Sequence, residues 1–135
     1  MSNHIYTVQF RLYGSDLVPS EISAQIGLNA CNGSRRPAVK KNGKPTNGIW
    51  AYDGSEDMAV KKTEWSSLEE GIIFVLEKIK PYHSAVLECS KIYQGIWWCG
   101  HFQSSFDGGP TLSVNILKEI SQFGFPIFID NYFFS

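Results

Sequence analysis

The segment Gln94–Gln103, QGIWWCGHFQ, carries two adjacent tryptophans, a cysteine and a histidine within ten residues. Its pattern is typical of a β-strand, in which successive side chains take opposite faces. We expect one face to form core and the other to stay open, if helices cover only one side of the sheet. The core set is Ile96, Trp98, Gly100 and Phe102, and the open set is Trp97, Cys99 and His101.

Three further segments have the composition of strands. The first, Ile5–Tyr13, alternates apolar and polar residues with a period of two, which predicts a strand with one buried face. A short strand follows at 48–54, where Asp53 and Gly54 signal a turn. The last expected strand is PIFIDNYFF, at 126–134.

Helical segments alternate with these strands. Pro19 suits the first turn of a short helix, and Gly27 is suited to end it. A longer helix begins with a serine cap and continues with apolar residues at helical spacing. The expected helices lie within 17–28, 66–82, 83–92 and 113–123.

This order of strands and helices predicts an α+β fold. We expect one domain over residues 1–135, built on a four-stranded, mostly antiparallel sheet with helices packed on one face. Because extra helices stand between the second and third strands, the expected arrangement is ferredoxin-like with a helical insertion at that point. The pattern does not determine the strand order.

The composition limits the functional classes. A net charge of −1 gives no overall attraction for nucleic acids or anionic membranes. Cys31, Cys89 and Cys99 form no CxxC pair, which predicts reduced thiols in a cytoplasmic protein rather than a disulfide framework or a zinc site. The N-terminal residues show no signal-peptide pattern, and no apolar run is long enough for a membrane helix. We therefore expect no metal and no cofactor.

Cys99 and His101 raise the question of cysteine catalysis. In an extended strand their Cβ atoms lie roughly 6–7 Å apart, too far for a thiolate–imidazole contact unless the strand bulges. No oxyanion loop or orienting side chain is identifiable nearby. A small cysteine/histidine-dependent enzyme is one alternative, and a structural cysteine beside a half-exposed histidine is the other.

The open sheet face suggests a different function. Single-stranded RNA stacks on strand aromatics, and a homodimer interface has a similar composition. Nucleic-acid binding is disfavoured, because the net charge is slightly negative and the basic-aromatic signature is missing. The residues expected to join Trp97 and His101 on this face are Trp50, Tyr52, Phe128, Tyr132, Thr7, Gln9 and Arg11.

Charged residues gather in two segments. The loop Asn29–Asn47 is basic and long, which predicts either a solvated loop or a docking surface for an acidic partner. The stretch 53–70 is acidic, and its last carboxylates stand at the expected start of a helix, where they stabilise the helix dipole. Both segments are candidates for contacts with a protein partner.

Four stretches together resemble a bacterial family, the domain of unknown function numbered 4279. They are FRLYGSDLVPSEISAQIGL, the GIW after the basic loop, LEEGIIFVLEKI and the terminal LSVNILKEISQFGFPIFIDNYF, and the resemblance covers almost the entire chain. The family has no established activity, so the resemblance transfers no catalytic residue. It implies a stand-alone cytoplasmic module of the kind encoded beside polymorphic or contact-dependent toxins.

The leading hypothesis is a non-enzymatic binding protein, and most specifically an immunity protein that binds and neutralises a cognate bacterial toxin. Surplus aromatic residues are suited to be interaction hot spots, and clustered charges of both signs favour a protein partner. The expected partner-binding residues are Arg35, Arg36, Lys40, Lys41, Glu69, Glu70, Trp97 and His101.

Overall fold

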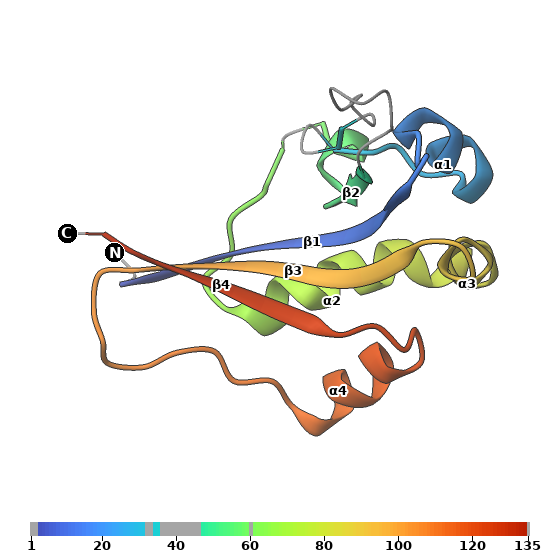
Figure 1. Ribbon diagram of the computed structural model, residues 1–135. Coiled ribbons are helices and arrows are strands. Elements are labelled where there is room, and N and C mark those ends of the chain that lie inside the picture. The colour runs from blue at the N-terminus through green and yellow to red at the C-terminus, as the bar shows by residue number, and fades with distance from the viewer. Residues whose placement is uncertain (1–2, 32–33, 36–46, 60, 135) are drawn as a thin grey trace.

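A computed structural model describes residues 3–31, 34–35, 47–59 and 61–134 (Figure 1). Strands and helices follow one another in the expected order, and the α+β fold is confirmed. In chain order the elements are β1 (His4–Ser15), α1 (Pro19–Ile26), β2 (Asn47–Tyr52), α2 (Leu68–Ile79), α3 (His83–Ser90), β3 (Gln94–Gln103), α4 (Val114–Ser121) and β4 (Ile127–Phe133), with 3-10 turns at Ser55–Asp57 and Lys80–Tyr82.

A four-stranded sheet in the order β2-β1-β3-β4 organises the described chain. β1 pairs antiparallel with β2 and β3, whereas β3 pairs parallel with β4. The predicted mostly antiparallel sheet is therefore confirmed, with α2 and α3 inserted between β2 and β3. The order fits a ferredoxin-like arrangement roughly. β3 and β4 run parallel because their connection contains a crossover helix, α4.

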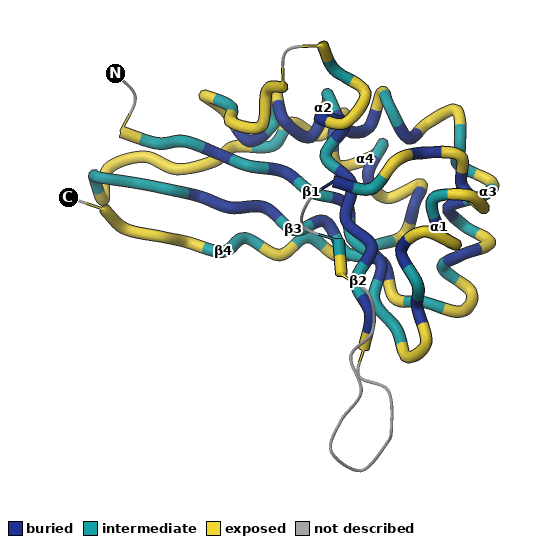
Figure 2. The backbone as a smooth tube through the Cα atoms, turned by 90° about the horizontal axis from the view of Figure 1, so that it is seen from above, coloured by how far each residue is buried: buried dark blue, intermediate teal, exposed yellow. Residues whose placement is uncertain are grey.

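The helices pack against one face of the sheet and share a single core with it (Figure 1). α1 and α3 lie together at one end of the sheet in both views of the backbone (Figures 1 and 2). Gly71 allows α2 to approach β1 closely, since a Cβ at this position would lie 2.7 Å from Cγ2 of Val8. The buried side chains of α2 recur at helical spacing, as Leu68, Ile72, Val75, Leu76 and Ile79.

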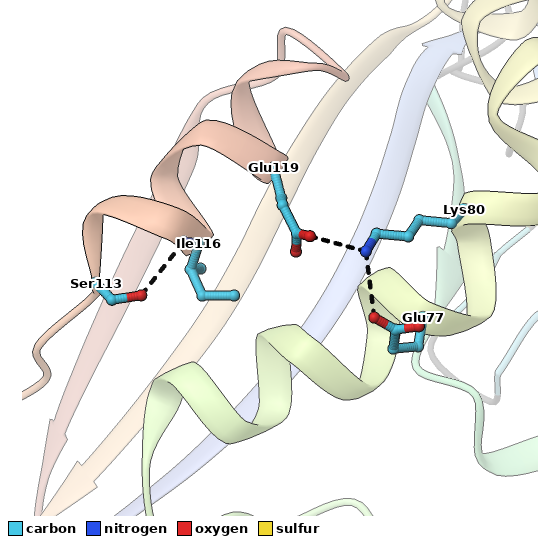
Figure 3. A network of polar contacts seen from close by, with 5 residues as sticks. All are labelled: Glu77, Lys80, Ser113, Ile116 and Glu119. Carbon is cyan, nitrogen blue, oxygen red and sulfur yellow. Dashed lines mark hydrogen bonds and ion pairs between the residues drawn. The ribbon is translucent and has the colours of Figure 1, made fainter.

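Polar contacts attach α4 to the end of α2 (Figure 3). The backbone N–H of Ile116 donates to Oγ of Ser113 at 3.3 Å, which caps the first turn of α4. Nζ of Lys80 lies 3.2 Å from Oε1 of Glu77 and 2.9 Å from Oε1 of Glu119. Because these charges are exposed, the ion pairs orient α4 more than they stabilise the fold.

The predicted face of β3 is wrong. Trp97, Cys99 and His101, which were expected on the open face, are buried in the core. The register explains this, because Trp97 pairs with Phe10 and places both side chains on the helix-covered face. Their rings meet edge to face, with centroids 5.6 Å apart. Of the expected core set, Ile96, Trp98 and Phe102 are half-exposed on the opposite face, and Gly100 is buried.

Burial on β2 and β4 also differs from the expectation (Figure 2). Trp50 and Tyr52, also expected on the open face, are fully buried and stack on each other with ring centroids 5.8 Å apart. β4 differs from β1 and β3, because none of its residues is buried. The open face expected from the sequence therefore exists, but a different set of side chains occupies most of it.

Candidate functional site

The open face of the sheet carries two aromatic pairs, each with one ring from β3 and one from β4. Trp98 meets Phe128 with ring centroids 4.5 Å apart, and Phe102 stacks on Tyr132 at 4.9 Å. The parallel register sets the members of each pair directly opposite each other. Phe128 and Tyr132 keep 40% and 46% of their surface exposed. We call these four residues, together with Arg11, the aromatic face.

Arg11 holds a fixed position on this face. Its guanidinium carbon lies 4.4 Å from the centroid of the Trp98 ring, a cation–π geometry. Its Nε donates to Oε1 of Gln9 at 2.8 Å, and one terminal nitrogen donates to the hydroxyl of Tyr13 at 3.2 Å. Within the described part of the chain, no carboxylate forms an ion pair with Arg11. The guanidinium therefore keeps donor capacity for an anionic group of a ligand.

A groove of about 730 Å³ adjoins the aromatic face where β3 begins. Tyr13 and Trp98 line it from the sheet, and Tyr93, Phe125 and Pro126 line it from the segments before β3 and β4. Most of these side chains are aromatic, which favours an apolar group as occupant. The aromatic face and the groove share Trp98, so they form one continuous candidate site.

Cys99 does not have the surroundings of a cysteine nucleophile. The side chain is buried in the core. Burial raises the pKa of the Cys99 thiol to about 12, so the reactive thiolate is scarce near neutral pH. This direction is opposite to the lowered pKa that an activated cysteine requires.

His101 connects three strands inside the sheet. Its Nδ1 lies 2.9 Å from Oδ1 of Asn131 on β4, and its Nε2 lies 2.8 Å from Nδ1 of His4 on β1. The ring also stacks on Tyr6, with centroids 4.6 Å apart. Since both ring nitrogens have hydrogen-bond partners and the residue is buried, these contacts account for His101 as a structural residue.

The charged candidates do not gather around the aromatic face. Arg35 is exposed, and its backbone pairs with Ile49 at the outer edge of β2. Oε1 of Glu69 accepts the backbone N–H of Ser113, and Glu70 is exposed near the start of α2. Arg36, Lys40 and Lys41 lie outside the described residues. Trp97 and His101 are buried, so the prediction that they lie on an exposed binding face is wrong.

Among the residues that the structure describes, no three histidine, cysteine or acidic side chains are close enough to hold a metal ion together. In the same residues, no helix has the length and apolar character needed to cross a bilayer.

The aromatic face contains residues that the sequence pattern assigned to the core. The sequence pattern assigns the two faces of β3 the wrong way round, with Trp98 and Phe102 in the core and Trp97 and His101 on the open face. The pattern cannot distinguish the faces, because both sets of alternating side chains are largely apolar. Arg11, Phe128 and Tyr132 were expected on the open face, and they are found there. The polar residues Gln9 and Arg11 mark the open face of β1. They would also have placed Trp98 on the open face, but only if the register between β1 and β3 were known.

Comparisons with known proteins give one finding. A family model described as Domain of unknown function (DUF4279) matches residues 4–134, which include every strand and helix. No curated protein and no solved structure matches the chain.

Proposed function

We propose that this chain, which belongs to the DUF4279 family, is a non-enzymatic binding protein that contacts a protein partner through its aromatic face. In its most specific form, the proposal is an immunity protein that acts in the cytoplasm and neutralises a cognate bacterial toxin. The partner then binds as a folded domain in a one-to-one complex. The family description carries no activity, so the proposal depends on the surface of this chain.

The observation that carries the proposal is the exposed aromatic cluster beside a fixed arginine. Tryptophan, tyrosine and arginine are the residue types most enriched among interaction hot spots. Trp98, Tyr132 and Arg11 lie on one surface, and the neighbouring groove has room for a partner side chain. Because the sheet backbone and the paired rings hold these side chains in place, little conformational entropy is lost when a partner binds.

The experiment is an affinity purification of the tagged chain from the organism that encodes it, with every co-eluting chain quantified by mass spectrometry. We expect a toxin domain in near-equimolar amount. Trp98→Ala should remove that domain from the eluate, whereas Leu117→Ala should leave it unchanged. Leu117 is the matched control, because it is an exposed apolar residue on α4 that does not belong to the aromatic face.

A companion experiment tests neutralisation. Deleting the gene in a strain that meets the toxin should make the strain sensitive, and the wild-type chain should restore resistance. A deletion strain that stays resistant would overturn the immunity form of the proposal. Recovery of the chain without any other protein, in an eluate whose light scattering gives the mass of a dimer, would replace the toxin with a second copy as partner.

Single-stranded RNA is the second candidate, because stacked rings on an open sheet are also the platform that such RNA uses. The charge on this face does not favour it, since the face carries one arginine and also the Asp130 carboxylate, which accepts a hydrogen bond from the Tyr132 hydroxyl. We expect no binding of a poly-uridine oligonucleotide at either low or physiological salt. Binding that weakens steeply with salt and is lost in Trp98→Ala would favour RNA instead.

A further inference from the structure

The groove lies beside a stretch of strand edge that β4 leaves uncovered. β4 follows β3 only from Trp97 onward, where the N–H of Trp97 donates to the carbonyl of Pro126 at 2.9 Å. Before that point, Gln94–Ile96 have β1 on one side and the groove on the other. Over these residues the edge of β3 therefore faces the groove instead of β4.

The backbone of Gly95 faces this groove. Successive residues of a central strand direct their N–H and C=O groups to alternate neighbours, so Gly95 directs both groups to the same side as Trp97. Pro126 is the residue that would continue the ladder there, but it has no N–H to donate to the Gly95 carbonyl. Among the described residues we find no other partner for these two groups, although Gly95 is buried. Buried backbone groups without partners are rare in native proteins.

The groove walls are built on close contacts between aromatic rings and glycines. A Cβ on Gly95 would lie 2.8 Å from Cδ1 of Phe125, so any larger residue would push this ring away. The ring of Tyr93 is likewise packed against the backbone of Gly14. Phe125 thus packs against β3 at its free stretch, and Tyr93 packs against the neighbouring β1; both rings line the groove, in positions that other residues at these glycines would not permit.

We infer that the groove binds an extended segment of the protein partner, which pairs its backbone with Gly95 and inserts a large apolar side chain between the rings. The inference rests on the proposed function and adds the chemistry of the partner's contact segment. Strand addition of this kind takes affinity from main-chain hydrogen bonds and specificity from side-chain pockets. The groove volume of about 730 Å³ lies within the range of roughly 300–1,000 Å³ typical of ligand sites.

The segment also carries a carboxylate beside its apolar residue. Arg11 contacts Trp98 and Tyr13, and both of these residues line the groove. Its guanidinium has no carboxylate partner within the described part of the chain, so an acidic side chain of the ligand complements it. An acidic residue next to a phenylalanine or tryptophan is therefore the expected recognition element.

Two capped dipeptides test this inference with the full chain. N-acetyl-Asp-Phe-N-methylamide and N-acetyl-Phe-Asp-N-methylamide are titrated into nitrogen-15-labelled protein and followed by amide chemical shifts. We expect saturable shifts at the amide of Gly95 and at the indole N–H of Trp98 for at least one of them. Absence of saturation at millimolar concentrations, or shifts confined to other surfaces, would overturn the inference.

Matched variants separate the two parts of the recognition. Arg11→Gln should weaken binding of the acidic dipeptide about tenfold, as expected for a hydrogen bond to a charged group, and leave its asparagine analogue unchanged. A probe in which an ester replaces the amide that donates to the Gly95 carbonyl should bind more weakly than the amide. Equal affinities in both comparisons would contradict the geometry.

A groove-filling variant distinguishes this inference from the proposed function. Ser90→Phe and Gln94→Phe both place a ring at the groove lining, and amide spectra show whether each variant remains folded. Loss of partner capture in the folded variants supports the inference. If they retain the partner while Trp98→Ala loses it, the proposed function stands and the groove inference fails. If no variant or wild-type chain captures a partner, the proposed function fails, whereas the dipeptide result still decides whether the groove binds.

Discussion

Truncation of the adjacent tryptophans 97 and 98 should lower the stability of the fold by clearly different amounts. Trp97 is fully buried, so Trp97→Ala removes a core ring and leaves a cavity, a change that costs about 3–5 kcal/mol. With an unfolding entropy of about 2.1 cal/mol/K per residue, this loss lowers the Tm of a 135-residue domain by about 10–18 °C. Trp97 thus carries a large share of the stability expected for a domain of this size.

Trp98→Ala should be much milder for the fold. It removes the contact with Arg11, worth about 0.5–1 kcal/mol, and the contact with Phe128, worth about 0.5–1.5 kcal/mol. The expected loss of about 1–2.5 kcal/mol corresponds to about 4–9 °C in Tm. Trp98→Ala should nevertheless abolish partner capture, because Trp98 belongs to both the aromatic face and the groove.

Thermal melts and urea titrations of the two variants, followed by circular dichroism, provide the comparison. Trp97→Phe is a useful third variant, because it retains a ring and removes an indole N–H that has no hydrogen-bond partner within the described structure. Its cost should be less than half that of Trp97→Ala. Equal losses for Trp97→Ala and Trp98→Ala, or a greater loss for Trp98→Ala, would refute the assignment of the two faces.

Two further predictions concern stability. Ser67→Ala should lower the free energy of unfolding in urea by about 1 kcal/mol, because the backbone N–H of Glu70 loses the Ser67 hydroxyl that caps α2 at 3.1 Å. Ser66→Ala, at the neighbouring exposed serine, should lower it clearly less. Equal losses for the two variants would argue against the cap. Burial raises the pKa of Cys99 from 9.0 to about 12, so the folded state keeps a proton that the unfolded chain releases above pH 9. Through this group, stability should fall by about 1.4 kcal/mol per pH unit between pH 9 and pH 12, and Cys99→Ala should flatten that dependence in melts over the same range. Native Cys99 should also resist iodoacetamide at pH 8, as read by mass spectrometry, and rapid alkylation would contradict its burial.

The periodic signals predicted the elements because they depend on local chemistry alone. The alternation around Phe10, the proline at the start of α1 and the glycine at its end act within one or two turns of chain. Gly27 indeed ends α1 in the left-handed region, at φ 95°. These local signals do not depend on which segments pack against them, so strands and helices could be placed from the sequence.

The face of β3 could not be predicted in the same way, because it depends on pairing between distant segments. Both alternating sets of β3 contain a tryptophan, so composition does not identify the buried side. Pairing with β1 determines which face of β3 is buried, because Phe10 is opposite Trp97 and Arg11 is opposite Ile96. The groove has the same origin, since Tyr93 and Phe125 come from separate segments and line one groove only after β3 and β4 have paired.

The central position of β1 also affects how the chain folds as it is synthesised. β1 precedes its partner β3 by 81 residues, from Tyr13 to Gln94, up to 99 residues, from His4 to Gln103. At about 5–20 residues per second, a ribosome needs about 4–20 s to make the intervening chain. During that time the apolar stripe of β1 has only β2 and the early helices to cover it. Pairing over such distances is slow, so we expect this protein to rely on chaperones that shield its first strand until β3 emerges.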